Sequence, residues 1–251
     1  MAFVTRGGFD GIVFPAPVAG GRANTLATVA QLMVSQWWSA EDLRAWQLRQ
    51  AERLIAFAYS SPHVRAAASR AGCKPGDALT DRVWSRWPVF ERDQARALGD
   101  ALFMTPPATH GAIAQDATSG STGTPLTIRK TELSQFMYHA ASLRELLWSG
   151  RDISQLYALI KAVPGLESGY PEGATMSDWG GVVSTIYDTG PAFVLDIRTP
   201  IEQAAEWVKR IAPGYLGTFP SMVEGIVDEF ERRGWSPPPI KSVRTQGEVV
   251  S

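Results

Sequence analysis

The stretch that decides the fold is Phe193–Thr245, which reads FVLDIRTPIEQAAEWVKRIAPGYLGTFPSMVEGIVDEFERRGWSPPPIKSVRT. Three short apolar runs predict strands at 193–195, 215–218 and 240–245. Helical periodicity fills the two intervals: Thr199–Glu202 and Ser221–Glu224 match the capping-box pattern that opens a helix, and Gly234 ends the second helix. Strands that alternate with helices in this way are typical of an α/β layer with parallel neighbours.

A run of small polar residues precedes this layer. It consists of Thr118, Ser119, Gly120, Ser121, Thr122, Gly123, Thr124 and Pro125. Glycines let several backbone N–H groups point at one spot and hydroxyls add donors without bulk, so the run predicts a phosphate-binding loop. It is not a Walker loop, because no Gly-Lys pair follows Gly120 at the required spacing. The same composition also fits a simple turn, and this alternative stays open.

The chain before the loop has the pattern of helices. Ser39 can cap a helix that ends before Ser61-Pro62, a second helix runs from about His63 to Ala71, and further helical signal follows Pro88. Residues 1–39, rich in Gly, Ala and Pro, look irregular.

After the loop, a short strand at 126–129 leads to a helix that Thr131 can cap, and 155–163 is strand-like. The Gly-rich stretch 166–190 resists assignment. We therefore predict an α/β fold, in which a helical N-terminal segment is followed by a layered α/β subdomain with largely parallel strands.

Composition narrows the function. With 45% apolar and 20% charged residues and a mean hydropathy of −0.09, the 251-residue chain resembles ordinary globular proteins, and no apolar run approaches the roughly 18 residues of a membrane span. The net charge of −1 provides no positive field for nucleic acid. A single cysteine, Cys73, and three histidines exclude an internal disulfide and a zinc cluster. We expect neither nucleic acid nor a membrane as partner, and a reducing, cytoplasmic setting.

Beyond its physical character, the loop at 118–125 resembles the nucleotide loop of the adenylate-forming enzymes, and its surroundings resemble the phenylacetate-coenzyme A ligase-like branch. The segments that agree, in chain order, are LIAFAYSSPHVR at 54–65, WPVFERD at 87–93, GTFPSM at 217–222 and TQGE at 245–248. The loop is the most specific evidence for this resemblance, whereas the other segments support it mainly because they occur in the same order as in the family. Together they span roughly Ala40 to Ser251.

This resemblance implies an activity. Such enzymes use ATP and Mg²⁺ to convert a carboxylic acid into an acyl adenylate and usually pass the acyl group to coenzyme A. The implied partners of this chain are a small carboxylic acid and ATP, and a homodimer is an assembly that the sequence permits. By resemblance, Thr118–Thr124 cradle the ATP phosphates, while Gly247 and Glu248 end the strand whose loop faces adenine.

The chain also departs from the family. Many relatives have lysine where Thr124 stands, and Arg129 or Lys130 are the nearby cations that can partly replace it. The family's tyrosine- and glutamate-containing motif, ribose aspartate and mobile C-terminal domain with its catalytic lysine have no counterpart in these 251 residues. We therefore expect residues 40–251 to be the N-terminal portion of an adenylation (AMP-binding) domain, truncated and with little or no ligase activity by itself.

No other group of residues suggests rival chemistry. His110 lies before the loop and His139 lies within a predicted helix, where a packing or surface role is the ordinary one. Cys73 is interpreted as a small residue at a turn, so we assign no catalytic residue and no metal ligand. Two alternatives to a truncated ligase remain: a non-catalytic nucleotide- or acyl-binding module derived from such a ligase, and a structural α/β protein whose loop is only a turn.

Overall fold

The computed structural model describes residues 20–117 and 126–248. These residues form two compact units, with borders inside the helices α1 and α6. We call residues 27–117 and 126–141 the helical unit, and residues 20–26 and 142–248 the sheet unit. Each is described by itself. No helix in the described ranges is long and apolar enough to cross a membrane.

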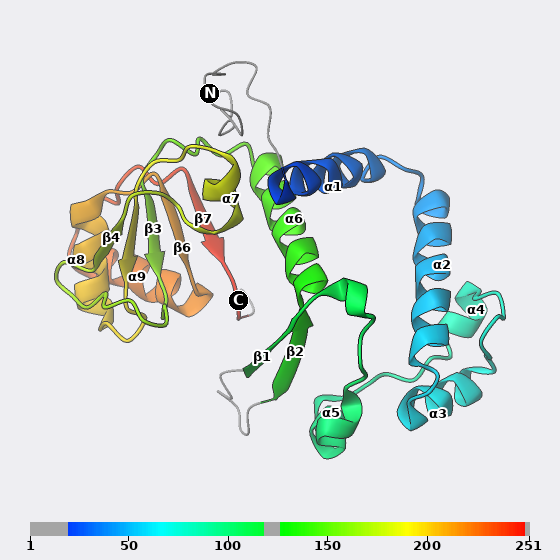
Figure 1. The fold of residues 1–251 in the computed structure, drawn as a ribbon. Helices are drawn as coiled ribbons and strands as arrows, with labels where there is room; N and C mark the ends of the chain where they lie inside the picture. The colour runs from blue at the N-terminus through cyan, green and yellow to red at the C-terminus, as the bar shows by residue number, and fades with distance from the viewer. Residues whose placement is uncertain (1–19, 118–125, 249–251) are drawn as a thin grey trace. The chain divides into compact units, whose positions relative to one another are not determined.

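The helical unit contains the first helices and a two-stranded hairpin (Figure 1). Its elements are α1 (Gly21–Ser35, shared with the sheet unit), α2 (Ala40–Ala58), α3 (Pro62–Ala71), α4 (Asp81–Trp84), α5 (Arg92–Leu98), the 3-10 turns η1 (Gly99–Leu102) and η2 (Ala108–His110), β1 (Ile113–Ala117), β2 (Thr127–Thr131) and the start of α6 (Glu132–Trp148). A small core is formed by Ile55, Cys73 and Leu79.

Several helix boundaries in this unit agree with the sequence predictions. Ser39 caps α2 by accepting the Asp42 N–H at 3.0 Å, and Gly72 closes α3 in the left-handed conformation with φ 73°. Thr131 caps α6, because its hydroxyl accepts the Ser134 N–H at 3.1 Å. The predicted strand at 126–129 is observed as β2.

Two predictions for this half of the chain are wrong. Residues 21–35, assigned to an irregular extension over 1–39, form the helix α1. After Gly21 they contain neither Gly nor Pro and include three Ala and two Leu, so local helix propensity outweighs the turn-like composition upstream. The segment before the loop is not wholly helical, because 113–117 form β1. All five of its residues are exposed, which removes the alternation that marks a half-buried strand.

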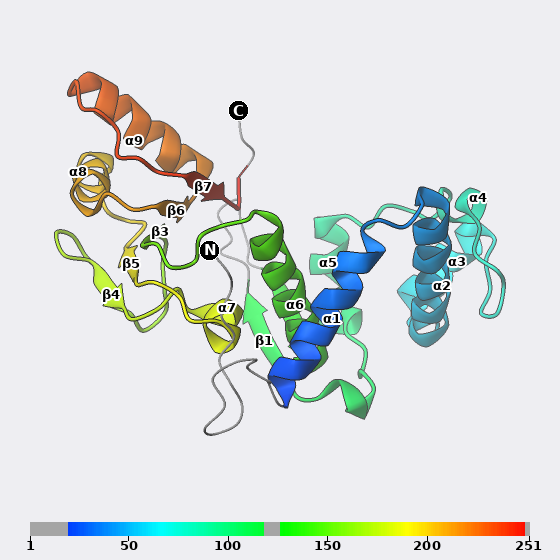
Figure 2. The ribbon, with the colours of Figure 1, turned by 90° about the horizontal axis from the view of Figure 1, so that it is seen from above.

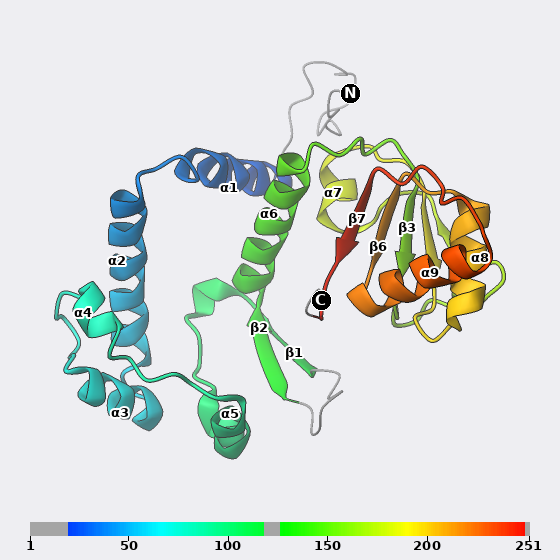
Figure 3. The same cartoon turned by 180° about the vertical axis from the view of Figure 1, so that it is seen from behind.

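The sheet unit is a five-stranded sheet covered by helices (Figure 2). Its elements are β3 (Tyr157–Ile160), β4 (Ala174–Met176), α7 (Gly181–Ile186), β5 (Ala192–Leu195), α8 (Ile201–Ile211), β6 (Tyr215–Thr218), α9 (Pro220–Arg232) and β7 (Ser242–Thr245). The strand order is β4-β5-β3-β6-β7, and Figure 3 shows β7 at one border. All pairs are parallel except β4 with β5, so the predicted α/β layer with largely parallel strands is confirmed.

The core of the sheet unit lies between the sheet and the helices α8 and α9. Ala158, Ile160 and Leu216 point to this side, where they meet the fully buried Trp207 of α8 and Phe230 of α9. Because side chains alternate along a strand, Tyr157, Leu159 and Lys161 belong to the opposite face. The strand pattern thus separates an apolar packing face from a more polar one.

Two helix starts differ from the predicted capping boxes. Helix α8 begins at Ile201, after Pro200 in an extended conformation, and has no side-chain cap. Helix α9 begins at Pro220, with Phe219 at the N-cap position and again no cap from that side chain. Pro220 takes the first helical position of α9, which proline favours, whereas Pro200, predicted at the first helical position of α8, is its N-cap residue.

Candidate functional site

The predicted phosphate loop connects the two strands of the hairpin. Thr118, Ser119, Gly120, Ser121, Thr122, Gly123 and Thr124 lie outside the described residues. The flanks are described: β1 and β2 are antiparallel, and Ala117 is paired with Thr127 across the hairpin. The chain therefore enters and leaves the loop at two backbone-paired positions of the helical unit.

The two cations after the loop already have partners. The Arg129 guanidinium lies 3.0 Å from the Asp100 carboxylate and 4.3 Å from the centre of the Phe103 ring. Lys130 forms an ion pair with Asp116 across the hairpin. Both bridges are partly solvent-exposed, so each is a weak interaction. Asp100 and Asp116 thus neutralise the two cations, Arg129 and Lys130, that were expected to replace in part the lysine of the family at position 124.

An open cavity of about 380 Å³ lies in the helical unit. It is lined by Ala95, Arg96, Gly99, Asp100, Leu102, Phe103, Leu126 and Thr127. Leu126 and Thr127 are the first described residues after the predicted loop.

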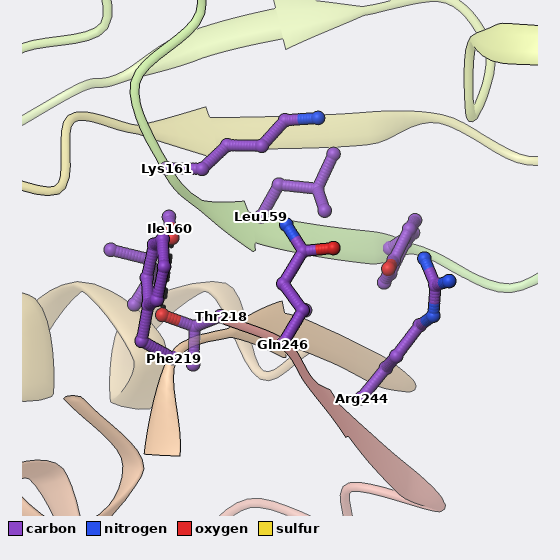
Figure 4. A pocket seen from close by; sticks show the side chains of 9 residues that line it. Leu159, Ile160, Lys161, Thr218, Phe219, Arg244 and Gln246 are labelled. Carbon is purple, nitrogen blue, oxygen red and sulfur yellow. Dashed lines mark hydrogen bonds between the residues drawn. The ribbon is translucent and has the colours of Figure 1, made fainter. Parts of the chain in front are cut away.

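A second pocket lies at the carboxyl ends of the parallel strands in the sheet unit. We call it the sheet pocket; its volume is about 50 Å³ and it is lined by Tyr157, Leu159, Ile160, Lys161, Gly217, Thr218, Phe219, Arg244 and Gln246. Figure 4 shows Lys161 and Gln246 on the same side of the sheet as Leu159 and Arg244. The carboxyl ends of parallel strands are where open α/β sheets bind ligands.

One row of paired residues forms the floor of the sheet pocket. Leu159 is paired with Gly217, and Gly217 is paired with Arg244. A Cβ atom on Gly217 would lie 2.4 Å from the Tyr157 hydroxyl oxygen and 2.8 Å from a Leu159 methyl carbon. Only glycine therefore lets the Tyr157 hydroxyl lie over the neighbouring strand β6.

The electrostatics of this floor centre on Arg244. Its guanidinium donates two hydrogen bonds to Glu145 of α6, with N–O distances of 3.0 and 2.7 Å, in the bidentate geometry that fits carboxylates best. Arg244 also lies beside the Tyr157 hydroxyl. Burial raises the pKa of Tyr157, and the positive charges of Arg151 and Arg244 oppose that rise. At neutral pH the hydroxyl is thus a neutral donor and acceptor.

The predicted residues Gly247 and Glu248 follow strand β7 and contact the first residues of α9. Gly247 has φ 84°, and a Cβ atom there would lie 2.8 Å from the Phe219 ring, so glycine is required on two counts. The Glu248 carboxylate accepts the backbone N–H of Ser221 at 2.9 Å, and this bond holds the pKa of Glu248 below its usual value. In this structure Glu248 supplies the cap that the residues of α9 do not.

The remaining reactive residues differ in burial: Cys73 is buried, His110 is intermediate and His139 is exposed. Cys73 is buried and burial raises the pKa of its thiol, which disfavours the nucleophilic thiolate. His110 ends the turn η2, and His139 lies in α6 beside Tyr138. Within residues 20–117 and 126–248, no group of three or more His, Cys, Asp or Glu side chains could hold a metal ion.

Sequence reasoning did not single out the polar residues of the sheet pocket. Lys161 stands directly after the apolar run of β3, and Arg244 lies in the last strand. Their position at strand ends in a predicted parallel sheet was the signal that could have identified them.

Comparison with known proteins identifies the fold. A scan against protein-family models and a search of curated proteins find no match. Among solved structures, 2-hydroxyisobutyryl-CoA ligase in an open conformation with 2-HIB-AMP and CoA matches with a TM-score of 0.58 at 15% identity, over 84% of this chain and 48% of that chain. The same ligase in its thioesterification state matches with a TM-score of 0.56 at 17% identity, over 84% and 44% of the two chains. Its postadenylation state with 2-HIB-AMP matches with a TM-score of 0.57 at 15% identity, over 83% of this chain and 43% of that chain.

These matches confirm, for the fold, the resemblance to the adenylate-forming enzymes. The chain spans just under half the length of the ligase that it resembles. The likeness covers the mixed helix and sheet architecture with its mostly parallel sheet.

Proposed function

We propose that this chain takes part in the ATP-dependent activation of a carboxylic acid to an acyl adenylate, with coenzyme A as the acyl acceptor. Mg²⁺ enters with ATP as part of the substrate. The proposal is supported by the shared fold with an acyl-CoA ligase whose solved structures hold an acyl adenylate and CoA. Attack of a carboxylate on a phosphate requires positioning and charge stabilisation rather than a protein nucleophile, which suits a chain with its thiol buried.

The observation that carries the proposal is the hairpin that presents the loop. Backbone pairing of β1 with β2 fixes both flanks of Thr118–Thr124, from Ala117 on one side to Thr127 on the other. A phosphate cradle depends on backbone N–H groups that are oriented before the ligand arrives. Because Arg129 and Lys130 are engaged by carboxylates, the proposal assigns the phosphates to the N–H groups and hydroxyls of the loop.

Gly247 and Glu248 have a more limited role in this proposal than the loop. The Glu248 carboxylate is occupied by the Ser221 N–H. The proposed contribution of this turn to the adenine site therefore comes from its backbone. A cytoplasmic location, consistent with the reduced and buried Cys73, belongs to the same proposal.

Calorimetric titration with MgATP tests the loop directly. We expect the chain to bind MgATP, and Gly120→Ala and Gly123→Ala to weaken binding about tenfold or more, the equivalent of one lost hydrogen bond to a charged group. Gly169→Ala is the matched control, because Gly169 lies in the sheet unit with open space around its Cα and no positive φ. If the wild-type chain does not bind MgATP, or if the loop variants bind as the control does, the loop is only a turn.

A pyrophosphate-release assay with candidate acids measures the adenylation activity of the chain alone. Nucleotide binding with little or no release is the result that we expect, both for one part of a ligase and for a non-catalytic binding module. Robust release by residues 1–251 would contradict our expectation of little or no ligase activity in this chain alone.

A further inference from the structure

The ammonium group of Lys161 is a positive charge in the sheet pocket to which the described residues give no role. The Lys161 backbone N–H donates to the Leu195 carbonyl oxygen at 3.0 Å, which fixes the residue at the carboxyl edge of the sheet. The side chain is half-buried and lines the pocket together with Thr218 and Gln246. Within residues 20–117 and 126–248 the ammonium group has no ion-pair partner.

The neighbouring charges do not compensate Lys161. Arg244, the other cation of the pocket, is held by both carboxylate oxygens of Glu145. Asp196, at the end of β5, forms its ion pair with Arg198 at 2.6 Å. No carboxylate is among the described lining residues, so the sheet pocket carries one uncompensated positive charge.

The donors and the size of the pocket indicate what it accepts. The Lys161 ammonium has three N–H donors and the Gln246 side chain has an amide, which together suit the two oxygens of a carboxylate. A volume of about 50 Å³ corresponds to a few water-sized spheres. This space is large enough for a carboxylate group.

The chemistry of adenylation indicates whether the carboxylate bound in the sheet pocket is the reacting one or another one on the same substrate. The carboxylate that attacks ATP loses its charge when the acyl adenylate forms. A fixed cation paired with it would stabilise the ground state more than the transition state and would slow the reaction. A second carboxylate elsewhere on the acid keeps its charge throughout, so its pairing with Lys161 contributes to binding without opposing the chemistry.

We propose that Lys161 and Gln246 bind a second carboxylate, so that the acid substrate is a dicarboxylic acid activated at one end. This inference rests on the proposed acid-activating function and adds the substrate class. It assigns Lys161 as a specificity-determining residue.

The test uses hydrolysis-resistant analogues of an acyl adenylate in matched pairs. In these analogues a sulfamate replaces the phosphate, and the acyl group is either butanoyl or butanedioyl, with hexanoyl and hexanedioyl as a longer pair. Because the reacting carboxyl is already joined to the sulfamate as its acyl group, the members of each pair differ only in the second carboxylate. Calorimetry gives the dissociation constants for the wild-type chain and its variants.

We expect the dicarboxylic analogue of at least one pair to bind about tenfold more tightly than its monocarboxylic partner. Lys161→Gln removes this preference and Lys161→Arg retains it. The control is Lys241→Gln, because Lys241 also belongs to the sheet unit but lies 4.0 Å from Asp152. Circular dichroism confirms that each variant is folded.

The outcomes separate this inference from the proposed function. If the analogues bind but neither pair shows a preference, or if Lys161→Gln keeps the preference, the dicarboxylate assignment is wrong while the acid-activating function stands. If no analogue binds to the folded wild-type chain, both proposals fall.

Discussion

Gly217 shows how one missing side chain shapes the sheet pocket. It lies between Leu159 and Arg244 in the paired row, and the space above it is taken by the Tyr157 hydroxyl. The Tyr157 ring lies beside the Trp179 ring, with ring centres 4.9 Å apart, and its hydroxyl interacts with Arg244. The floor of the sheet pocket therefore depends on the Tyr157 side chain packing directly against the backbone of Gly217.

We predict that Gly217→Ala destabilises the chain by about 1–3 kcal/mol, the usual cost of overpacking a filled site. The added methyl would lie within 3 Å of Tyr157 and Leu159. Urea unfolding measures the change. In the double variant with Tyr157→Phe, removal of the hydroxyl relieves part of the clash, so the second substitution should cost less than it does alone. Strictly additive effects would show that the contact is not the cause.

For individual residues, the sequence predicted where turn-forming residues lie better than it predicted which side chains contact one another. The glycine, serine and threonine run at 118–124 was visible from composition, whereas Gly247 was singled out only by the family resemblance of TQGE at 245–248. That Glu248 binds the α9 amide was not visible, because the two positions are far apart in sequence. Lys161 and Arg244 were missed for the same reason: pairing register decides which strand residues share a face.

Helix α9 depends on a carboxylate from outside the helix. Pro220 occupies the first helical position, where its missing N–H is harmless, and Ser221 donates the next N–H to Glu248. The negative charge also lies at the positive end of the helix dipole. The turn after β7 and the start of α9 are therefore stabilised together.

Replacement of Glu248 should weaken the first turn of α9. We expect stability to decrease in the order wild type, Glu248→Gln, Glu248→Ala, because glutamine keeps an acceptor but loses the charge. Amide hydrogen exchange at Ser221 should accelerate in the same order, while exchange at Phe230, in the last turns, is unchanged. Equal exchange at Ser221 in all three proteins would contradict the cap.

Elements with strong periodicity were predicted well, and weakly patterned ones were not. Helix α8 and strand β6 have a clear apolar face or run, whereas α1 is only weakly amphipathic and β4 has three residues. Strand β4 and helix α7 lie in the stretch 166–190, which contains five glycines and gives no periodic signal. Their positions are set by contacts instead: Gly173 approaches the Val194 carbonyl so closely that a Cβ atom would lie 2.5 Å from it.

Across the sheet unit, an ion network joins α9 to α8 and to the segment before β4. Buried Glu229 bonds Arg232 and Arg233, and Arg233 continues to Glu206 at 2.6 Å. Glu206 accepts the Tyr170 hydroxyl at 2.7 Å. The hydrogen bonds from Arg232, followed by those from Arg233, lower the pKa of Glu229 from 4.5 to about 2.

This network predicts the acid sensitivity of the sheet unit. Because the folded-state pKa of Glu229 is depressed, its stabilising contribution is complete above pH 4.5 and is lost as the pH falls towards 2. We expect Glu229→Gln to be less stable than wild type at pH 7 and to show a flatter decline between pH 4.5 and pH 2. Denaturant unfolding across this range measures both. Glu231→Gln, at an exposed position of the same helix, is the control and should leave the profile unchanged.

The two borders of the sheet have different consequences for the whole polypeptide. Among the described strands, β4 forms one border and pairs with β5 alone, through three antiparallel residues, whereas β7 forms the other border and pairs with β6 alone, through four parallel residues. The outer N–H and C=O groups of β7 form a template for another extended segment, beside the exposed side chain of Val243. A net charge of −1 gives copies of the chain little mutual repulsion. Net charge therefore offers little protection against pairing of two copies along this border.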